Sequence, residues 1–453
     1  ELMKIMANEV EFPEVLRGNF AHRFLELPQE ILINAMRKHQ KYFCAVDPHG
    51  RLLPYFFAIL NTRAEKADLI RLGHERVLSA RLHDAEFFWR EDLKTKLKNR
   101  RSLLSGLTYH EKLGQADKFY NKKVERMDRI SNEVLKQLEE PDLEKTLGSL
   151  IQVCKTDLVT LMVGEFPELQ GVMAGLYARA EGYKEEQWIA LYDQYMPVSM
   201  EDPLPRNQLG ALLSLTDRIE TVITGYILNM IPTGSRDPYG LRRVATGIVR
   251  IALEYQMDLN YISLFEKVIK FWPAPKGKLK PDELAQAFYD LIEARFRFLM
   301  EQKGISQETL NAVLNTEKQS FVRAQAKIAA LWSIRDSADL KTLARGFKRI
   351  NNIIRDQPHH PFASKLLIEA GEKRLHNAFE ELEPRLKQLI GEGNYPEAAS
   401  LMVTLGPEID QFFDEVLVMA EDSKLRNNRI ALLQQISDLY RNIADFSALQ
   451  IEL

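Results

Sequence analysis

The sequence predicts a mainly α-helical protein of several domains, with a small α/β or β-rich part at its N-terminus. Three observations predict this fold class. The chain has 453 residues, and a domain usually takes about 150 residues, so more than one domain is expected. The first 62 residues mix short apolar runs with turn signals. From about residue 65 onward, apolar side chains recur at three- and four-residue steps, the period of an amphipathic helix.

The N-terminal part contains a predicted β-hairpin. Residues 42–46 (YFCAV) form a strand-like apolar run, and residues 47–50 (DPHG) have the composition of a turn. Residues 52–60 (LLPYFFAIL) then predict a second strand. We interpret residues 1–64 as the remnant of an α/β or β-rich domain.

The remainder of the chain is predicted to be helical, with two breaks. Asp237 and Pro238 are a start signal, because Asp suits the N-cap and Pro suits the first helical position. Residues 272–277 (WPAPKG) interrupt the helical pattern and are the best linker candidate. Residues 357–361 (QPHHP) form a second break. The predicted helical domains are residues 65–256, 257–338 and 339–453.

Composition and charge exclude some classes of protein. The chain is 45% hydrophobic and 28% charged, as globular proteins are. Its 61 basic and 64 acidic residues give a net charge of −3, so any nucleic-acid partner must meet positive charge confined to one face. Cys44 and Cys154 are too few and too distant for a disulfide framework, which favours a cytoplasmic location. No apolar run is long enough to predict a membrane span.

The sequence contains none of the common motifs for nucleotide or metal chemistry. Neither a GxxxxGK[ST] loop nor a GxGxxG loop occurs, and the GxSxG and HExxH patterns are absent as well. We therefore predict no catalytic residue, no metal and no cofactor site in this chain.

One enzyme alternative is a metal-dependent phosphohydrolase of the HD type. That chemistry needs a His, a His-Asp pair and a later Asp that converge on a metal ion. His110, Asp157 and Asp217 have suitable spacing, but Thr156 stands where the histidine of the pair belongs. Losing that imidazole leaves too few ligands for a tight metal site. We interpret the four positions as an HD-like scaffold without its metal, and keep an active hydrolase as the alternative.

One predicted helix near the C-terminus concentrates positive charge on a single face. Between residues 341 and 360, five bases stand against one acid, Asp356. The bases are Lys341, Arg345, Lys348, Arg349 and Arg355. The opposite, apolar face consists of Leu340, Leu343, Phe347, Ile350 and Ile354. The charged face suits contact with nucleic-acid phosphates, and the alternative is an ordinary solvated helix face.

A second group of basic residues surrounds the helix predicted after Pro238. Its members are Arg236, Arg242, Arg243 and Arg250. Arg243 and Arg250 are seven residues apart and so lie on one side of a helix. The N-terminus of that helix, next to Arg236, is a candidate anion site. The alternative is that these arginines pair with acidic residues of the same chain.

Several longer blocks of the sequence resemble bacterial glycyl-tRNA synthetase β subunits. The two longest are residues 163–171 (VGEFPELQG) and 232–243 (PTGSRDPYGLRR). Residues 80–89, 110–114, 418–429 and 444–447 are similar to further blocks of that family. The blocks occur in the family's order and extend over almost the whole chain. Because the chain begins at Glu1 and not at Met, we expect it to be a C-terminal fragment of such a subunit.

The resemblance implies a role in joining glycine to tRNA(Gly). In this family the α subunit holds the class II active site that uses glycine, ATP and Mg²⁺, and the β subunit contacts tRNA within a heterotetramer. That division of labour agrees with the absence here of the HIGH-like, KMSKS-like and Gly-x-Gly-x-Arg signatures of synthetase catalytic domains. The expected partners are therefore tRNA(Gly) and the α subunit. A purely structural helical scaffold is the remaining alternative.

The resemblance also implies a role for each predicted domain. Residues 1–64 would end an editing-like (B3/B4-like) region, and residues 65–256 would form an HD-like helical domain. Residues 339–453 would form a DALR-like anticodon-binding domain that carries the basic helix. Unstacked anticodon bases stack on aromatic rings or arginine planes, so we expect Phe347, Arg349 and Arg355 to be candidates for base contact.

Overall fold

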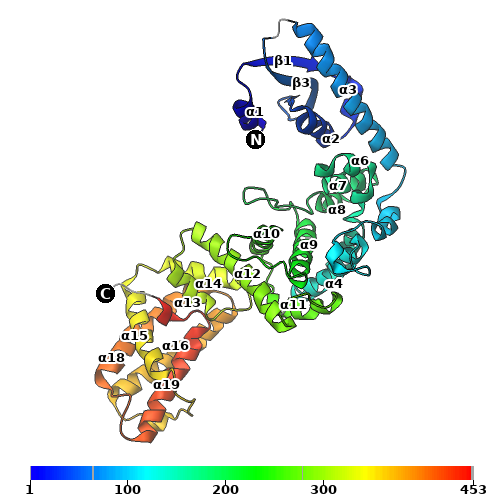
Figure 1. Ribbon diagram of the computed structural model, residues 1–453. Helices are drawn as coiled ribbons and strands as arrows, with labels where there is room; N and C mark the ends of the chain where they lie inside the picture. The colour runs from blue at the N-terminus through cyan, green and yellow to red at the C-terminus, as the bar shows by residue number, and fades with distance from the viewer. Residues whose placement is uncertain (1, 64–65, 278, 450–453) are drawn as a thin grey trace. The chain divides into compact units, whose positions relative to one another are not determined.

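The computed structural model describes residues 2–63, 66–277 and 279–449, with the backbone alone for His39 and Asp339. The chain divides into two compact units. The first unit comprises Glu1–Gly247 and Lys267–Leu279, and the second comprises Ile248–Glu266 and Lys280–Leu453. The predicted mainly helical fold class is confirmed (Figure 1). The finer division into four domains stays a prediction.

The first unit begins with a three-stranded antiparallel sheet, in which the predicted hairpin is present. The strands β1 (Pro13–Asn19), β2 (Phe43–Val46) and β3 (Leu52–Asn61) are arranged in the order β1-β3-β2. Side chains of β3 alternate between buried and half-buried positions. Gly18 of β1 pairs with Phe56 of β3, and the buried Phe56 ring lies so close that a Cβ on Gly18 would be 2.3 Å from it. This position therefore requires glycine.

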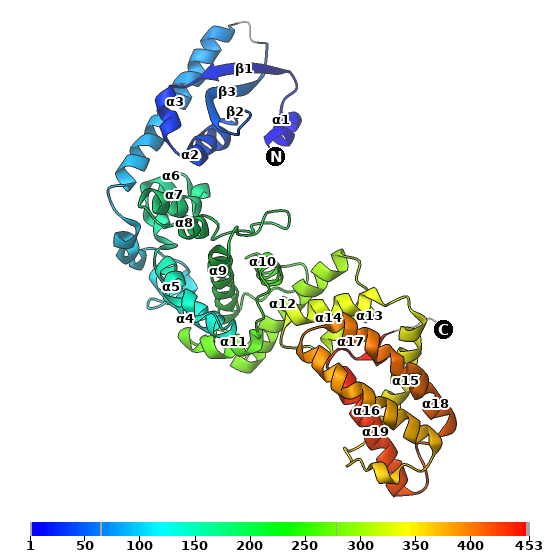
Figure 2. The ribbon, with the colours of Figure 1, turned by 180° about the vertical axis from the view of Figure 1, so that it is seen from behind.

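Helices cover one face of this sheet. The short α2 (Gln29–Asn34) and the long α3 (Ala67–Asp92) enclose the core, and both ribbon views show α3 lying along the sheet (Figures 1 and 2). The core consists of apolar side chains, among which Phe24, Phe56 and Leu82 are almost completely buried. This part therefore folds around its own hydrophobic centre.

The rest of the first unit is helical. Its helices are α1 (Leu2–Glu9), α4 (Tyr120–Gln137), α5 (Glu144–Val153), α6 (Leu161–Glu165), α7 (Val172–Ala180), α8 (Glu185–Tyr192) and α9 (Gln208–Ile227). Helix α9 is central, because it packs against α4, α5 and α8. Almost every side chain of α9 is buried, the pattern of a helix that is surrounded by others.

The segment at residues 272–277, predicted as a linker, does break the helical pattern, and it packs back onto α9. Trp272 is buried, and its indole N–H donates a hydrogen bond of 2.9 Å to Thr224. The backbone N–H of Lys276 donates to the carbonyl of Ile227 over 2.8 Å. Proline and glycine do break the helix here, but burial of the large indole ring holds the segment in place.

The second unit is entirely helical in the residues described. Its helices are α12 (Pro281–Gln302), α13 (Gln307–Leu314), α14 (Phe321–Ser333), α15 (Ala338–Ile354), α16 (Ala370–Gly391), α17 (Tyr395–Met402), α18 (Gly406–Glu415) and α19 (Ser423–Arg441). Helices α10 (Leu241–Glu254) and α11 (Tyr261–Val268) contribute residues to both units. Toward the C-terminus, α15 and α16 each pack against both α18 and α19 (Figure 2). Over the described ranges, no helix combines the length and the apolar character needed to cross a membrane.

Candidate nucleic-acid interface

Helix α15 places the predicted basic residues on its exposed face. Ser337 caps the helix by accepting a hydrogen bond of 3.1 Å from the N–H of Leu340. All five predicted bases are exposed, namely Lys341, Arg345, Lys348, Arg349 and Arg355. Of the predicted apolar face, Leu343 and Ile350 are fully buried and Ile354 is half-buried. The basic stripe consists of four of the five bases, Lys341, Arg345, Lys348 and Arg355, which follow one another at steps of four, three and seven residues. The stripe is about 21 Å long at 1.5 Å per residue.

Most of the positive charge on this stripe is not neutralised by acidic side chains of the part of the chain that the structure describes. Among the described residues, Lys341, Arg345, Lys348 and Arg355 have no acidic partner within 4.0 Å. Arg349 has only a distant one, since its guanidinium lies 3.9 Å from the carboxylate of Asp414. Four unpaired cations on one exposed face give a local positive potential, although the whole chain is slightly acidic.

The expectation that Phe347 contacts an RNA base is wrong. Its side chain is only 4% exposed, and its ring stacks on Tyr440 with 4.8 Å between ring centroids. Phe347 lies four residues from Leu343 and three from Ile350, so the helix turns it into the core. A buried ring cannot accept a stacked base.

The structure offers a different aromatic ring beside the stripe, which the sequence reasoning missed. Phe413 of α18 is half-buried, and the guanidinium of Arg349 lies 4.4 Å from the centre of its ring. A signal for it existed in the sequence. Phe412 and Phe413 are adjacent, and neighbouring residues of an α-helix point about 100° apart, so one of the two can lie at the edge of the core. Phe412 is the buried member of the pair.

The second group of arginines is not an open anion site. The helix predicted to start at Pro238 starts at Leu241, as α10. Asp237 accepts hydrogen bonds of 2.8 and 3.0 Å from the N–H groups of Leu241 and Arg242. The chain's own carboxylate therefore occupies the N-terminal amides that were expected to bind a phosphate.

The members of this group have different surroundings. The guanidinium of Arg242 donates to the carbonyl of Gly234 over 2.7 Å, and so fastens the preceding loop. Arg236 and Arg243 are exposed, whereas Arg250 is half-buried and engaged within the chain. Only Arg236 and Arg243 retain the exposure that contact with RNA requires, and such contact stays a prediction.

The HD-like positions surround a buried network of ion pairs. Asp217 of α9 lies 2.8 Å from the ammonium of Lys123 and 3.0 Å from that of Lys155. Glu220, one turn later, pairs with Lys123 and with Arg126. Burial alone would raise the pKa of Asp217, but the two lysine charges outweigh it and hold this pKa well below the usual range. Asp217 is therefore an ionised carboxylate that two ammonium groups neutralise.

The other three HD-like positions do not join Asp217. Thr156 is buried and donates its hydroxyl hydrogen bond to the carbonyl of Val153 over 2.7 Å. Asp157 is buried and accepts from the N–H of Gly171, and burial raises the pKa of its carboxyl to about 6. His110 is half-buried and accepts from the N–H of Lys112 over 3.3 Å.

These residues do not fit a divalent metal ion. Over the described ranges, no three His, Cys, Asp or Glu side chains converge as metal ligands. The carboxylate of Asp217 already contacts Lys123 and Lys155, whose ammonium charges stand where a cation would be needed. In the sequence, the lysine next to Thr156 was the one indication that a cation of the chain itself could pair with Asp217. The burial of Lys155 is visible only in the structure.

Two family models of known proteins match this chain and together cover most of both units. A family model described as glycyl-tRNA synthetase beta subunit matches residues 1–315, which is more than half of the chain. The chain belongs to the glycyl-tRNA synthetase β-subunit family. The resemblance found in the sequence blocks is thereby confirmed. A second model, described as the DALR anticodon binding domain, matches residues 343–448 of this β-subunit family member and includes most of α15.

Curated relatives in the β-subunit family are similar along nearly the whole chain. The glycine–tRNA ligase beta subunit of Acidobacterium capsulatum is 38% identical over 98% of this chain and 64% of its own length. Those of Geotalea daltonii and Natranaerobius thermophilus are 38% and 36% identical over 97% of this chain. The alignments take in 63% and 64% of those two relatives. The chain thus spans somewhat less than two thirds of the length of the relatives it matches.

Proposed function

We propose that this chain is the tRNA-binding part of a glycine–tRNA ligase β subunit. The assembled ligase would join glycine to tRNA(Gly) while ATP is cleaved to AMP and diphosphate. The glycine and ATP site, with its Mg²⁺, would lie on a partner α subunit in the cytoplasm. The chain described here would act by positioning, because holding the tRNA body brings the acceptor end to the partner's active site.

The observation that carries this proposal is the unneutralised basic stripe on α15. All of the stripe except Lys341 lies in the region that matches an anticodon-binding domain, and four of its cations have no acidic partner among the described residues. Cations held on a rigid helix release counterions when they meet phosphates, which favours binding of RNA. Arg349, placed over Phe413, adds a flat surface that suits an unstacked base.

The HD-like hydrolase alternative finds no support in the geometry of its site. A hydrolase would need Asp217 as a metal ligand, yet both of its oxygens contact lysine ammonium groups. The buried ion pairs instead connect α4, α9 and the segment at Lys155. A structural role for this network agrees with the burial of Lys123, Lys155 and Glu220 in the first unit.

A charge-reversal experiment tests the proposal. The double change Lys348→Glu with Arg349→Glu should weaken binding of tRNA(Gly) at least about 10-fold, because two attractive contacts become repulsive. Binding should be measured by filter retention at fixed ionic strength. The control is Lys136→Glu with Lys145→Glu, which alters net charge equally on exposed positions of α4 and α5. Equal affinities of the two double variants would contradict the placement of RNA on α15.

A comparison of tRNAs separates recognition from scaffolding. If the chain is the recognition part, it should bind tRNA(Gly) more tightly than an unrelated tRNA at the same salt concentration. A chain that binds neither tRNA would be a structural scaffold, and the proposed function would then be rejected for it.

A further inference from the structure

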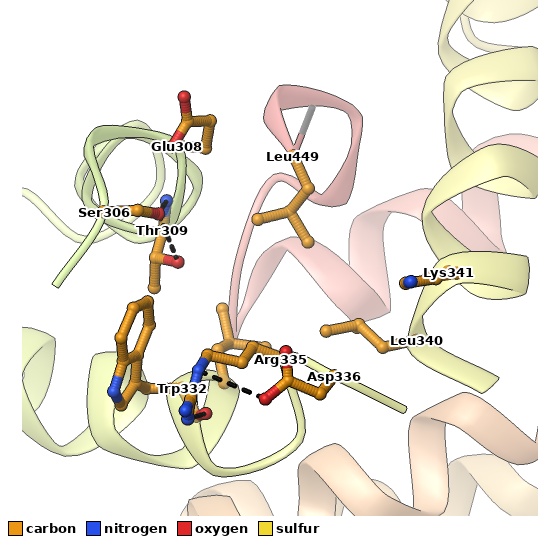
Figure 3. Close-up of a pocket in the computed structure, with 10 residues that line it drawn as sticks. Ser306, Glu308, Thr309, Trp332, Arg335, Asp336, Leu340, Lys341 and Leu449 are labelled. Atoms are coloured by element: carbon orange, nitrogen blue, oxygen red, sulfur yellow. Dashed lines mark hydrogen bonds and ion pairs between the residues drawn. The ribbon is translucent and has the colours of Figure 1, made fainter. Parts of the chain in front are cut away.

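A pocket of about 440 Å³ opens beside the start of α15. It lies between the first turn of α13, the end of α14 and the beginning of α15, and Figure 3 shows the side chains arranged around it. The side chains that decide its chemistry are Glu308, Trp332, Arg335, Asp336, Lys341 and Leu449. Its size is within the usual range for sites that bind small organic groups.

One side of the pocket is a platform formed by Trp332 and Arg335. The guanidinium of Arg335 lies over the indole ring of Trp332, 4.3 Å from its centre, and also donates to the carbonyl of Trp332 over 2.8 Å. Arg335 is exposed and Trp332 is half-buried. A fixed guanidinium on an indole ring presents a planar surface on which a nucleobase can stack.

The charges that line the pocket balance. Arg335 and Lys341 bring two positive charges, and Glu308 and Asp336 bring two negative charges. A pocket of this kind does not favour a phosphate, because two carboxylates repel it. It suits a neutral planar group, and the carboxylates can accept hydrogen bonds from an exocyclic amino group. Cytosine, adenine and guanine carry such a group and uracil does not.

The pocket is continuous with the basic stripe. Lys341 belongs to both, since it lines the pocket and is the first of the exposed cations on α15. A strand whose phosphates follow the stripe would therefore bring a nucleotide to the mouth of the pocket. Apolar groups at Leu340 and Leu449 would cover part of a base that enters.

We propose that this pocket takes one unstacked, amino-bearing base of the bound RNA, which stacks on the platform formed by Trp332 and Arg335. The proposal rests on the proposed function, because it assigns a base-binding position to RNA held on α15. Glu308 and Asp336 accept the hydrogen bonds of the base edge. Lys341 contacts the adjoining phosphate.

Tryptophan fluorescence tests the proposal directly. The chain has four tryptophans, and titration with tRNA(Gly) should quench the one at position 332. The quenching should be absent in Trp332→Phe and retained in the control Trp188→Phe, which changes a ring in the first unit. Oligocytidylate should quench more strongly than oligouridylate. Quenching that persists in Trp332→Phe would overturn the proposal.

Affinity measurements separate the failure of this proposal from failure of the proposed function. Trp332→Ala should weaken binding of tRNA(Gly) about 5- to 150-fold, the range for loss of one stacked base. Arg335→Ala should weaken it too, and this exposed position leaves the core intact. If both variants bind as the wild type does while Lys348→Glu with Arg349→Glu is impaired, the pocket is wrong and the stripe stands. If the unaltered chain binds no tRNA, both proposals fall.

Discussion

The buried charges of Lys123, Lys155, Asp217 and Glu220 in the first unit are tolerated because each has a partner of opposite sign. Lys155 is completely buried, and its ammonium contacts Asp217 and Gln194 at 3.0 Å each and lies 3.9 Å from the centre of the Tyr195 ring. Without such partners, an ammonium in this position would lose its proton. Lys123 pairs with both Asp217 and Glu220, so these ion pairs form one connected network with that of Lys155.

Asp157 is the exception at the residue scale. One of its carboxylate oxygens accepts from the N–H of Gly171, but the other has no hydrogen-bond partner among the described residues. Burial raises the pKa of this carboxyl to about 6, so the folded state favours the protonated form. The free energy of unfolding therefore falls as the pH rises from about 4 to about 6, because the carboxyl ionises first in the unfolded chain, and the loss is complete above that range.

Asp157→Asn should consequently stabilise the protein in a pH-dependent way. The difference of about two pKa units corresponds to a gain of up to about 3 kcal/mol above pH 7, which disappears toward pH 4. Urea unfolding at pH 8 and at pH 5 measures this difference. The matched control, Asp84→Asn at an exposed position of α3, should change little at either pH. An Asp157→Asn gain that is equal at both pH values would show that ionisation is not its cause.

At the scale of elements, two glycines allow α15 and α18 to pack closely. A Cβ at Gly346 of α15 would lie 2.7 Å from a methyl carbon of Ile409 in α18. A Cβ at Gly406, where α18 begins, would lie 3.3 Å from the backbone of Leu343. This contact fixes the helix that carries the basic stripe, so its exposed face depends on what is packed behind it.

We expect Gly346→Ala to destabilise the second unit. Alanine favours a helix by about 1 kcal/mol over glycine, but overpacking against Ile409 costs about 1–3 kcal/mol. Gly391→Ala is the contrasting change in α16, because nothing lies within 4 Å of a Cβ there. That variant should gain up to about 1 kcal/mol. Urea unfolding curves of both variants provide the test, and a gain for Gly346→Ala would contradict the close packing.

For the whole molecule, the charge distribution matters more than its sum. The net charge is −3, so the proposed binding of RNA would depend on the local stripe on α15, whose four cations have no acidic partner among the described residues, and not on general attraction. The salt dependence of the affinity should then reflect the release of counterions at a few phosphate contacts. A plot of the logarithm of the affinity against the logarithm of the salt concentration should have a slope of about −3.

The salt dependence should also respond to a single residue of the stripe. Lys348→Gln should reduce the magnitude of that slope by about one, because one phosphate contact is lost. Affinities for tRNA(Gly) at four or more salt concentrations give the slope for each protein. Lys145→Gln, on the exposed side of α5, should leave it unchanged. A slope that does not change in Lys348→Gln would place the phosphates elsewhere.

Features that depend on local pattern could be predicted from the amino-acid sequence alone. The hairpin of β2 and β3 followed from two apolar runs on either side of the turn residues Asp47–Gly50, and the two faces of α15 followed from the helical period. The missing histidine at Thr156 was visible in the same way. Family membership, too, could be predicted from the order of the sequence blocks.

The contacts of each side chain, in contrast, depend on how the elements pack in three dimensions. Phe347 was a candidate for base contact until its burial against Tyr440 was known, and Asp237 was a cap whose carboxylate fills the expected anion site. Lys155 and Asp217 are 62 residues apart in the chain, yet they form one ion pair. Trp332, Arg335 and Lys341 became a pocket only when α13, α14 and α15 came together. Sequence patterns report the periodicity of one element, whereas burial and pairing depend on contacts between elements distant along the chain.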